Sequence, residues 1–115
     1  MASAEKLDQL FRALGDRTRR TVLEDLARKE ASVSQLSAGH EMAMPSFMQH
    51  LRMLEEAGLV QSRKEGRVRI YRLNRRAYAG ASRWLERQEQ IWNRRLDQLD
   101  EYLLGERSQQ GEQDE

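Results

Sequence analysis

The chain has 115 residues, of which 38% are hydrophobic and 34% are charged, and its formal net charge is +1. We expect one domain with a modest core, whose stability would gain from burial against a second copy. The absence of cysteine excludes disulfides, thiolate metal sites and thiol nucleophiles. No run of about 18 apolar residues and no signal-peptide core is present, so we expect a cytoplasmic protein without membrane contact.

Two helices are predicted first. The segment "SAEKLDQLFRALG" has apolar residues at helical spacing and stops at Gly15. Asp16 is placed to cap a second helix, because its carboxylate can accept from first-turn amides that have no helical partner. The inner faces of these helices are predicted to be Leu7, Leu10, Phe11, Leu14, Val22, Leu23 and Leu26.

Two shorter helices follow, joined by a tight turn near Gly39. The third begins at Ala31 or Ser32, and the fourth is the segment "MPSFMQHLRMLEEAG", whose second residue is the only proline of the chain. Its spacing places an apolar stripe inward, while polar residues lie on the opposite side. The inward residues are Phe47, Leu51 and Leu54, and the outward ones are Pro45, Gln49, Arg52 and Glu56.

A β-hairpin is predicted next, from "LVQSRK" and "VRIYRLN" with a turn at "EG", where Gly66 supplies a positive φ. A hairpin after a helix-turn-helix is a wing. The expected fold is therefore a mainly α winged helix-turn-helix with the order helix, helix, helix, helix, strand, strand, helix. The stretch "RKEGRVRIYRLNRR" holds seven basic residues and one acidic residue, which suits a polyanion.

The last helix is expected from about Arg75 to Leu104, with Asn74 as its cap. At a rise of 1.5 Å per residue it is roughly 45 Å long, more than this domain needs for its own core. Part of its apolar stripe should pack against the first helix of the same chain. The remaining apolar surface predicts dimerisation through the terminal helices. The candidate interface is Leu7, Phe11, Trp84, Trp92, Leu96, Leu99 and Leu103. We divide the chain into a winged-helix and dimerisation domain (1–104) and a disordered, polar, acidic tail (105–115).

An outward-polar helix, a basic wing and a dimerising helix together favour double-stranded DNA as the ligand. The major groove admits a helix, where glutamine and serine reach base edges and arginine reads guanine or holds phosphate. Amides beside the proline of the fourth helix can face a phosphate. The candidate contacts are Pro45, Ser46, Gln49 and Arg52 on the helix and Arg63, Lys64, Arg67 and Arg69 on the wing.

Residues 14–73, "LGDRTRRTVLEDLARKEASVSQLSAGHEMAMPSFMQHLRMLEEAGLVQSRKEGRVRIYRL", resemble the ArsR-type winged-helix transcriptional repressors, with several family motifs in order. The resemblance implies DNA contact by Ser46, Gln49, His50 and Arg52, and by Arg67 with its basic neighbours. Arg17 replaces the family's usual proline, Met48 replaces a frequent serine or threonine, and Phe47 is bulkier than usual. These departures predict a different operator.

Many ArsR relatives sense metals through a thiolate pair in the third helix or through aspartate and histidine in the last helix. Here the third helix reads "SVSQLS", the last helix has no histidine, and His40 and His50 have no third ligand. We therefore expect no metal and no cofactor. A glycine-rich phosphate loop and a nucleophile with a base are also absent, so an enzyme is not expected.

The predicted function is a homodimeric, metal-independent repressor of a pseudo-palindromic operator, released by an unidentified inducer or antirepressor protein. Two alternatives stay open. One is a metal or small-molecule sensor of the same fold, which needs a ligand pocket. The other is a winged-helix module that binds a protein, which has no reason to carry a basic wing.

Overall fold

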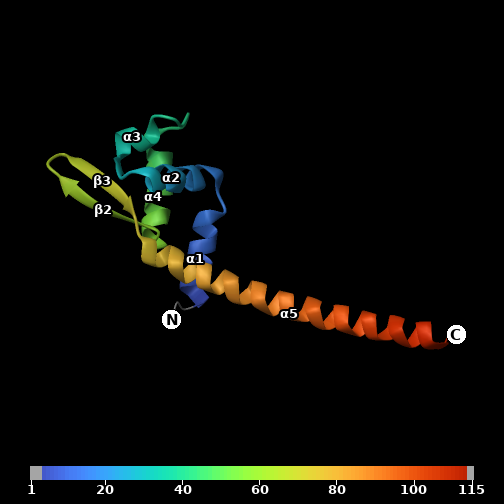
Figure 1. Ribbon diagram of the computed structural model, residues 1–115. Coiled ribbons are helices and arrows are strands. Elements are labelled where there is room, and N and C mark those ends of the chain that lie inside the picture. Colours follow the sequence, from blue (N-terminus) through green and yellow to red (C-terminus); the bar gives the residue numbers. More distant parts are fainter. Residues whose placement is uncertain (1–3, 114–115) are drawn as a thin grey trace. The chain divides into compact units, whose positions relative to one another are not determined.

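The computed structural model describes residues 4–113, and their side chains as far as residue 106. The chain forms two compact units, one ending at Ala81 and the other beginning at Ser82. The elements in order are α1 (Ala4–Leu14), α2 (Arg17–Arg28), β1 (Ala31–Ser32), α3 (Val33–Ser37), α4 (Met44–Glu56), β2 (Val60–Glu65), β3 (Val68–Leu73) and α5 (Arg75–Gln113), as Figure 1 shows. The predicted winged helix-turn-helix is confirmed.

Side-chain caps set the starts of the helices. The Asp16 carboxylate accepts from the backbone amide of Arg19 and caps α2. Ser32 and Gln35 form a reciprocal capping box that starts α3. The Asn74 side chain accepts from the amide of Arg76 at the start of α5 and donates to the carbonyl of Gly58, which ties that helix to the end of α4. The caps predicted at Asp16 and Asn74 are therefore confirmed.

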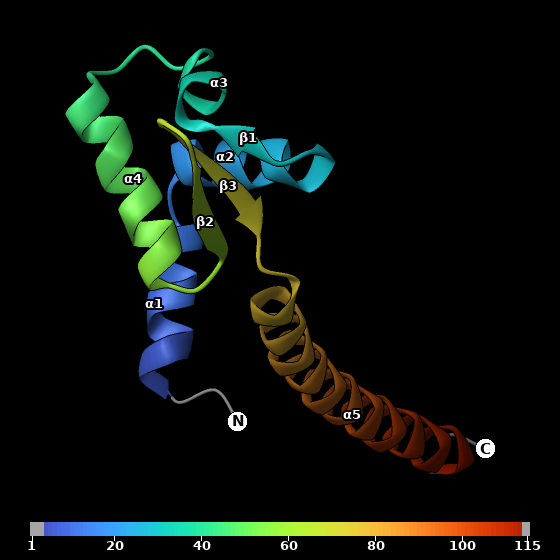
Figure 2. The same ribbon diagram turned by 90° about the vertical axis from the view of Figure 1, so that its left-hand side faces the viewer.

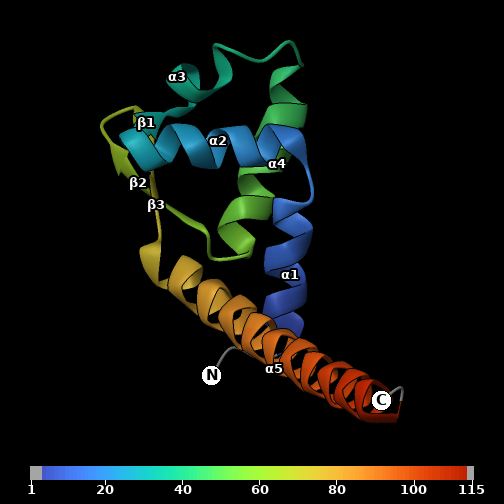
Figure 3. The same cartoon turned by 45° about the vertical axis from the view of Figure 1, so that its right-hand side comes forward.

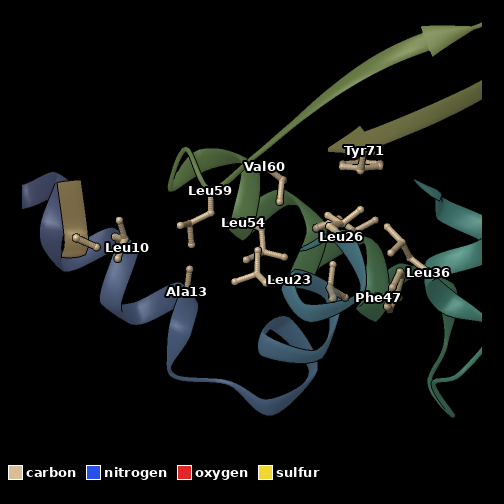
Figure 4. Packing of buried hydrophobic residues seen from close by; sticks show 13 residues of the cluster. Leu10, Ala13, Leu23, Leu26, Leu36, Phe47, Leu54, Leu59, Val60 and Tyr71 are labelled. Carbon is tan, nitrogen blue, oxygen red and sulfur yellow. The ribbon is translucent and has the colours of Figure 1, made fainter. Parts of the chain in front are cut away.

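The core of the first unit lies between the helices and the sheet. Helix α2 runs across α4 (Figure 3), and the apolar face of α2 contacts β3 while that of α4 contacts β2 (Figure 4). The buried apolar residues are Leu10, Ala13, Val22, Leu23, Leu26, Leu36, Phe47, Leu51, Leu54, Leu59, Val60, Tyr71 and Ala81. Phe47, Leu51 and Leu54 are fully buried, so the predicted inner stripe of the fourth helix is confirmed and fixes which face of α4 looks outward.

The sheet has three antiparallel strands in the order β1-β3-β2, with β1 beside β3 (Figure 2). Glu65 pairs with Val68, so the hairpin loop is Gly66 and Arg67, and Glu65 belongs to the strand rather than to the turn. Gly66 has a φ of 63° at the first loop position, which is the arrangement of a type II′ turn. The hairpin projects away from helices α1 to α4 (Figure 1).

Two further expectations differ from the structure. The order predicted from the sequence lacked β1, whose residues were assigned to the start of the third helix; Ala31 pairs with Tyr71 and Ser32 with Ile70. The last helix continues past Leu104 to Gln113, although an irregular tail was expected from Gly105. Each of the two glycines in this part of the helix, Gly105 and Gly111, costs only about 1 kcal/mol, and the polar residues between them include good helix formers. Residues 114 and 115 of that tail lie outside the described residues.

Candidate nucleic-acid interface

Helix α4 presents a polar face to solvent. Pro45, Ser46, Gln49 and Arg52 are exposed, and the apolar stripe on the other side of the helix holds them there. Pro45 stands in the first turn, where its missing amide removes no helical hydrogen bond. Ala43, the N-cap, forms no side-chain cap bond, so the first-turn amides are not closed off by a side chain. This end of α4 offers backbone donors and a positive dipole end to an anion.

The wing presents cationic side chains beside α4 in the same unit. Lys64, Arg67 and Arg69 are exposed, with Arg67 in the turn itself and Lys64 paired with Arg69 across the hairpin. Arg69 Nη1 donates to Ser62 Oγ at 3.0 Å, and Ser62 Oγ donates to Glu55 Oε1 at 2.8 Å. This chain of hydrogen bonds orients Arg69 and joins β2 to the last turn of α4. Lys64 and Arg67 extend the positive charge to the tip.

Arg63 is engaged within the chain. Its guanidinium makes a bidentate ion pair with Glu30 at 2.6 and 3.0 Å and donates to Glu65 at 2.9 Å. The hydrogen bond from Arg63 lowers the pKa of the Glu30 carboxyl below its ordinary value. A phosphate must displace Glu30 before it can take both arms of this guanidinium. In the predicted DNA contact, phosphate must therefore compete with Glu30 for Arg63, whereas no such acidic partner is described for Lys64 or Arg67.

His50 lies at the edge of the outward face of α4, and its side chain is 21% exposed. Its Nδ1 lies 3.0 Å from Nη1 of Arg19 and 3.7 Å from Oδ2 of Asp16. Burial alone would raise the pKa of the Asp16 carboxyl, but the hydrogen bond from the Arg19 amide and the charges of His50 and Arg19 outweigh it and lower that pKa. Arg19 was not among the functional residues predicted from the sequence. A signal was present, since Arg19 precedes Val22, Leu23 and Leu26 at helical spacing on the inner face of α2.

The residues predicted for a dimer interface differ in exposure. Leu7 and Phe11 of α1 are partly buried in the first unit. Trp84 is also partly buried, whereas Trp92 is 65% exposed and Leu96, Leu99 and Leu103 are about half exposed in the second unit. Helix α5 therefore carries a continuous apolar stripe on its exposed surface. A stripe of this size is uncommon on a chain that acts alone.

Known proteins of similar sequence and structure carry the same architecture. A helix-turn-helix domain profile matches residues 14–63. The HTH-type transcriptional regulator Rv2034 of Mycobacterium tuberculosis is 33% identical over 96 residues, which cover 84% of this chain and 87% of that protein. A crystal structure of an ArsR family transcriptional regulator, RHA00566, superposes with a TM-score of 0.75 at 40% identity and covers 81% of this chain and 97% of that one.

The chain belongs to the ArsR family of winged-helix transcriptional regulators. A further structural neighbour is the homodimeric winged helix-turn-helix DNA-binding domain of Mb0332 from Mycobacterium bovis. Its solution structure has a TM-score of 0.60 at 25% identity, and the match covers 76% of this chain and 82% of that one. The resemblance inferred from the motifs is thereby confirmed.

In the part that the structure describes, no three histidine, aspartate or glutamate side chains gather closely enough to hold a metal ion. None of its described helices combines the length and the apolar character needed to cross a membrane.

Proposed function

We propose that this ArsR family regulator is a homodimeric, metal-independent repressor that binds a pseudo-palindromic operator in double-stranded DNA. The observation that carries the proposal is the pairing, within one unit, of an exposed polar face on α4 with an exposed basic wing. A helix of this kind fits the major groove, where Gln49 and Ser46 would reach base edges and Arg52 would take guanine or phosphate. Lys64, Arg67 and Arg69 would hold the backbone beside it.

Pairing of two copies supports the symmetry of the operator. The exposed apolar stripe on α5 offers a surface for a second chain, and the Mb0332 domain is itself a homodimer. Two copies would bring two α4 helices to successive major grooves about 34 Å apart. The protected site should therefore be two-fold symmetric and longer than one helical turn.

The test compares two variants on DNA. Selection from a random duplex pool first yields the operator. Gln49→Ala should then weaken operator binding by about 1–3 kcal/mol and relax the preference at one base position, because it removes a base contact. Arg67→Ala should weaken all sequences nearly equally and reduce the salt slope by about one unit per contact, because it removes one phosphate contact. Each change acts twice in a symmetric dimer. Binding isotherms over a salt series on operator and scrambled duplex measure both effects.

Two control variants lie on α5. Gln90→Ala makes the same truncation as Gln49→Ala, and Arg83→Ala removes the same charge as Arg67→Ala; both residues are exposed in the second unit. The controls should bind like the parent. If Gln49→Ala weakens both duplexes alike, or if neither test variant differs from its control, α4 does not read DNA and the protein-binding alternative replaces the proposal.

The sensor alternative needs a ligand pocket. An open hollow of about 580 Å³ lies between the end of α4 and the sheet. Several polar groups on its walls already bond within the chain: Glu55 to Ser62, Asn74 to the carbonyl of Gly58, and Arg63 to Glu30. The hollow therefore gives no support to the sensor alternative over the repressor. We propose further that the repressor acts in the cytoplasm, has no catalytic activity, and is released from DNA by an inducer or an antirepressor protein.

A further inference from the structure

Arg19 is a charged residue buried in the first unit, with 9% of its surface exposed. A buried guanidinium is stable only when its donors find acceptors. Arg19 Nε donates to the carbonyl of Ala13 at 2.8 Å, and Nη2 donates to the carbonyl of Arg12 at 3.0 Å. Both carbonyls belong to the last turn of α1, and that of Arg12 also accepts from the backbone amide of Gly15 at 3.1 Å. Arg19 thus closes the C-terminus of α1 and is held by it in one orientation.

The remaining arm of Arg19 reaches α4. Nη1 lies 3.0 Å from Nδ1 of His50 and donates to Sδ of Met53 at 3.3 Å. A guanidinium has donors and no acceptor, so the bond to His50 forms only when Nδ1 offers its lone pair. In a neutral imidazole the ring hydrogen is then on Nε2. This tautomer follows because the Arg19 guanidinium can only donate a hydrogen bond.

Asp16 could instead accept a hydrogen bond from His50 if Nδ1 carried the hydrogen. Its Oδ2 would accept from a protonated Nδ1, but the two atoms are 3.7 Å apart, too far for a hydrogen bond. That carboxylate already caps α2 through the amide of Arg19 at 3.1 Å. The shorter contact with Arg19 Nη1 therefore decides the tautomer of His50 in the neutral state.

We propose that Arg19 is a positioning residue for DNA binding, which fixes His50 of α4 as the Nε2–H tautomer so that His50 donates from Nε2 to a DNA phosphate. The proposal rests on the proposed function. Nδ1 faces the interior and Nε2 is on the far edge of the ring, while the His50 side chain is 21% exposed and lies one helical turn after exposed Ser46. A neutral N–H donor suits a backbone contact that carries no sequence information. The buried arginine would then set the chemistry of a surface contact.

The first test needs no DNA. Long-range ¹H–¹⁵N spectra of the ¹⁵N-labelled protein at about pH 8, where histidine is generally neutral, report which ring nitrogen carries hydrogen. The chain has two histidines, so His40→Gln assigns the signals. We expect His50 to be the Nε2–H tautomer in the parent and in Met53→Leu, which leaves the Arg19 contact in place. Arg19→Lys should shift it toward a mixture. An Nδ1–H tautomer in the parent overturns the proposal without any variant.

The second test uses a random-sequence duplex at low salt, because a phosphate contact does not depend on sequence. His50→Asn keeps an acceptor near the Nδ1 position for Arg19 and removes the Nε2 donor. We expect about three- to tenfold weaker binding with an unchanged melting temperature. His50→Gln places an amide near the Nε2 position and should bind within about threefold of the parent. Equal binding by His50→Asn and the parent overturns the phosphate contact.

The two failures can be told apart. If the parent does not bind DNA, the proposed function fails and the phosphate contact fails with it, whereas the tautomer measured without DNA still decides whether Arg19 orients His50. If the parent binds DNA but His50 is Nδ1–H, only the role of Arg19 fails.

Discussion

Tyr78 is a phenol partly buried against the core of the first unit, and burial raises its pKa to about 12. The ordinary tyrosine pKa is about 10, so the folded state holds the proton more tightly than the unfolded state. The resulting stabilisation is fully present below about pH 10 and is lost as the pH rises toward 12. We expect Tyr78→Phe to remove this component, on the order of 1–2 kcal/mol after allowance for partial solvent access.

Urea unfolding of the parent and of Tyr78→Phe between about pH 9.5 and pH 12 measures the difference. Tyr102→Phe is the matched control, because Tyr102 is 63% exposed. Titration of lysines affects all three proteins equally, so only the gap between their curves matters. Parallel curves for the parent and Tyr78→Phe would contradict the assignment.

Single-residue signals were readable from the sequence where their chemistry is local. Asp16 bonds an amide three residues away, and Gly66 adopts the positive φ that its turn requires. Arg19 could not be read in the same way, because its bond to His50 joins residues 31 positions apart. His50 was predicted to contact DNA by resemblance. Its bond to Arg19 depends on the packing of α2 against α4, which no local sequence pattern predicts.

At the scale of elements, the bidentate ion pair between Arg63 and Glu30 ties the wing to the segment before β1. Glu30→Gln should remove the ion pair of Nη1 and Nη2, while the bond from Nε to Glu65 stays in place. The two freed nitrogens can then reach phosphate, so DNA binding should strengthen and the salt slope should steepen by up to about one unit per protomer. A salt series on a random-sequence duplex measures the slope. The ion pair is exposed, so the stability of the fold should change little.

Glu24→Gln is the control for Glu30→Gln, because it removes the same charge from the exposed surface of α2. If both variants change the salt slope alike, the effect is general electrostatics rather than release of Arg63. In the double variant Glu30→Gln with Arg63→Ala, the added slope should disappear. Persistence of that slope would also count against the idea.

Element types were predictable from periodicity and caps, whereas one strand and one boundary were not. β1 has two residues and no alternating pattern of its own, and it exists because Ile70 and Tyr71 of β3 pair with it. Such pairing is tertiary and leaves no local signal. The end of α5 was predicted at Leu104 because apolar periodicity stops there, but a helix continues without an apolar face when its residues favour it.

At the scale of the whole molecule, the apolar stripe of α5 has the spacing of a helix–helix seam. Trp92, Leu96, Leu99 and Leu103 follow one another at intervals of four, three and four residues. This alternation is the pattern of positions that meet a partner helix in coiled coils. All four side chains are about half exposed or more in the single chain. A second copy of α5 is the partner that the repeated pattern matches, because it carries the same seam.

Leu99→Glu should therefore split the dimer, because it places a charge in the centre of an apolar seam. Sedimentation velocity should show a dimer for the parent at micromolar concentration and a dissociation constant raised at least about thirtyfold for Leu99→Glu. Gln90→Glu adds the same charge to an exposed position outside the stripe and should stay dimeric. Circular dichroism should show an intact first unit, since Leu99 is not part of its core. A parent chain that sediments as a stable monomer would refute the dimer and with it the two-fold symmetric operator.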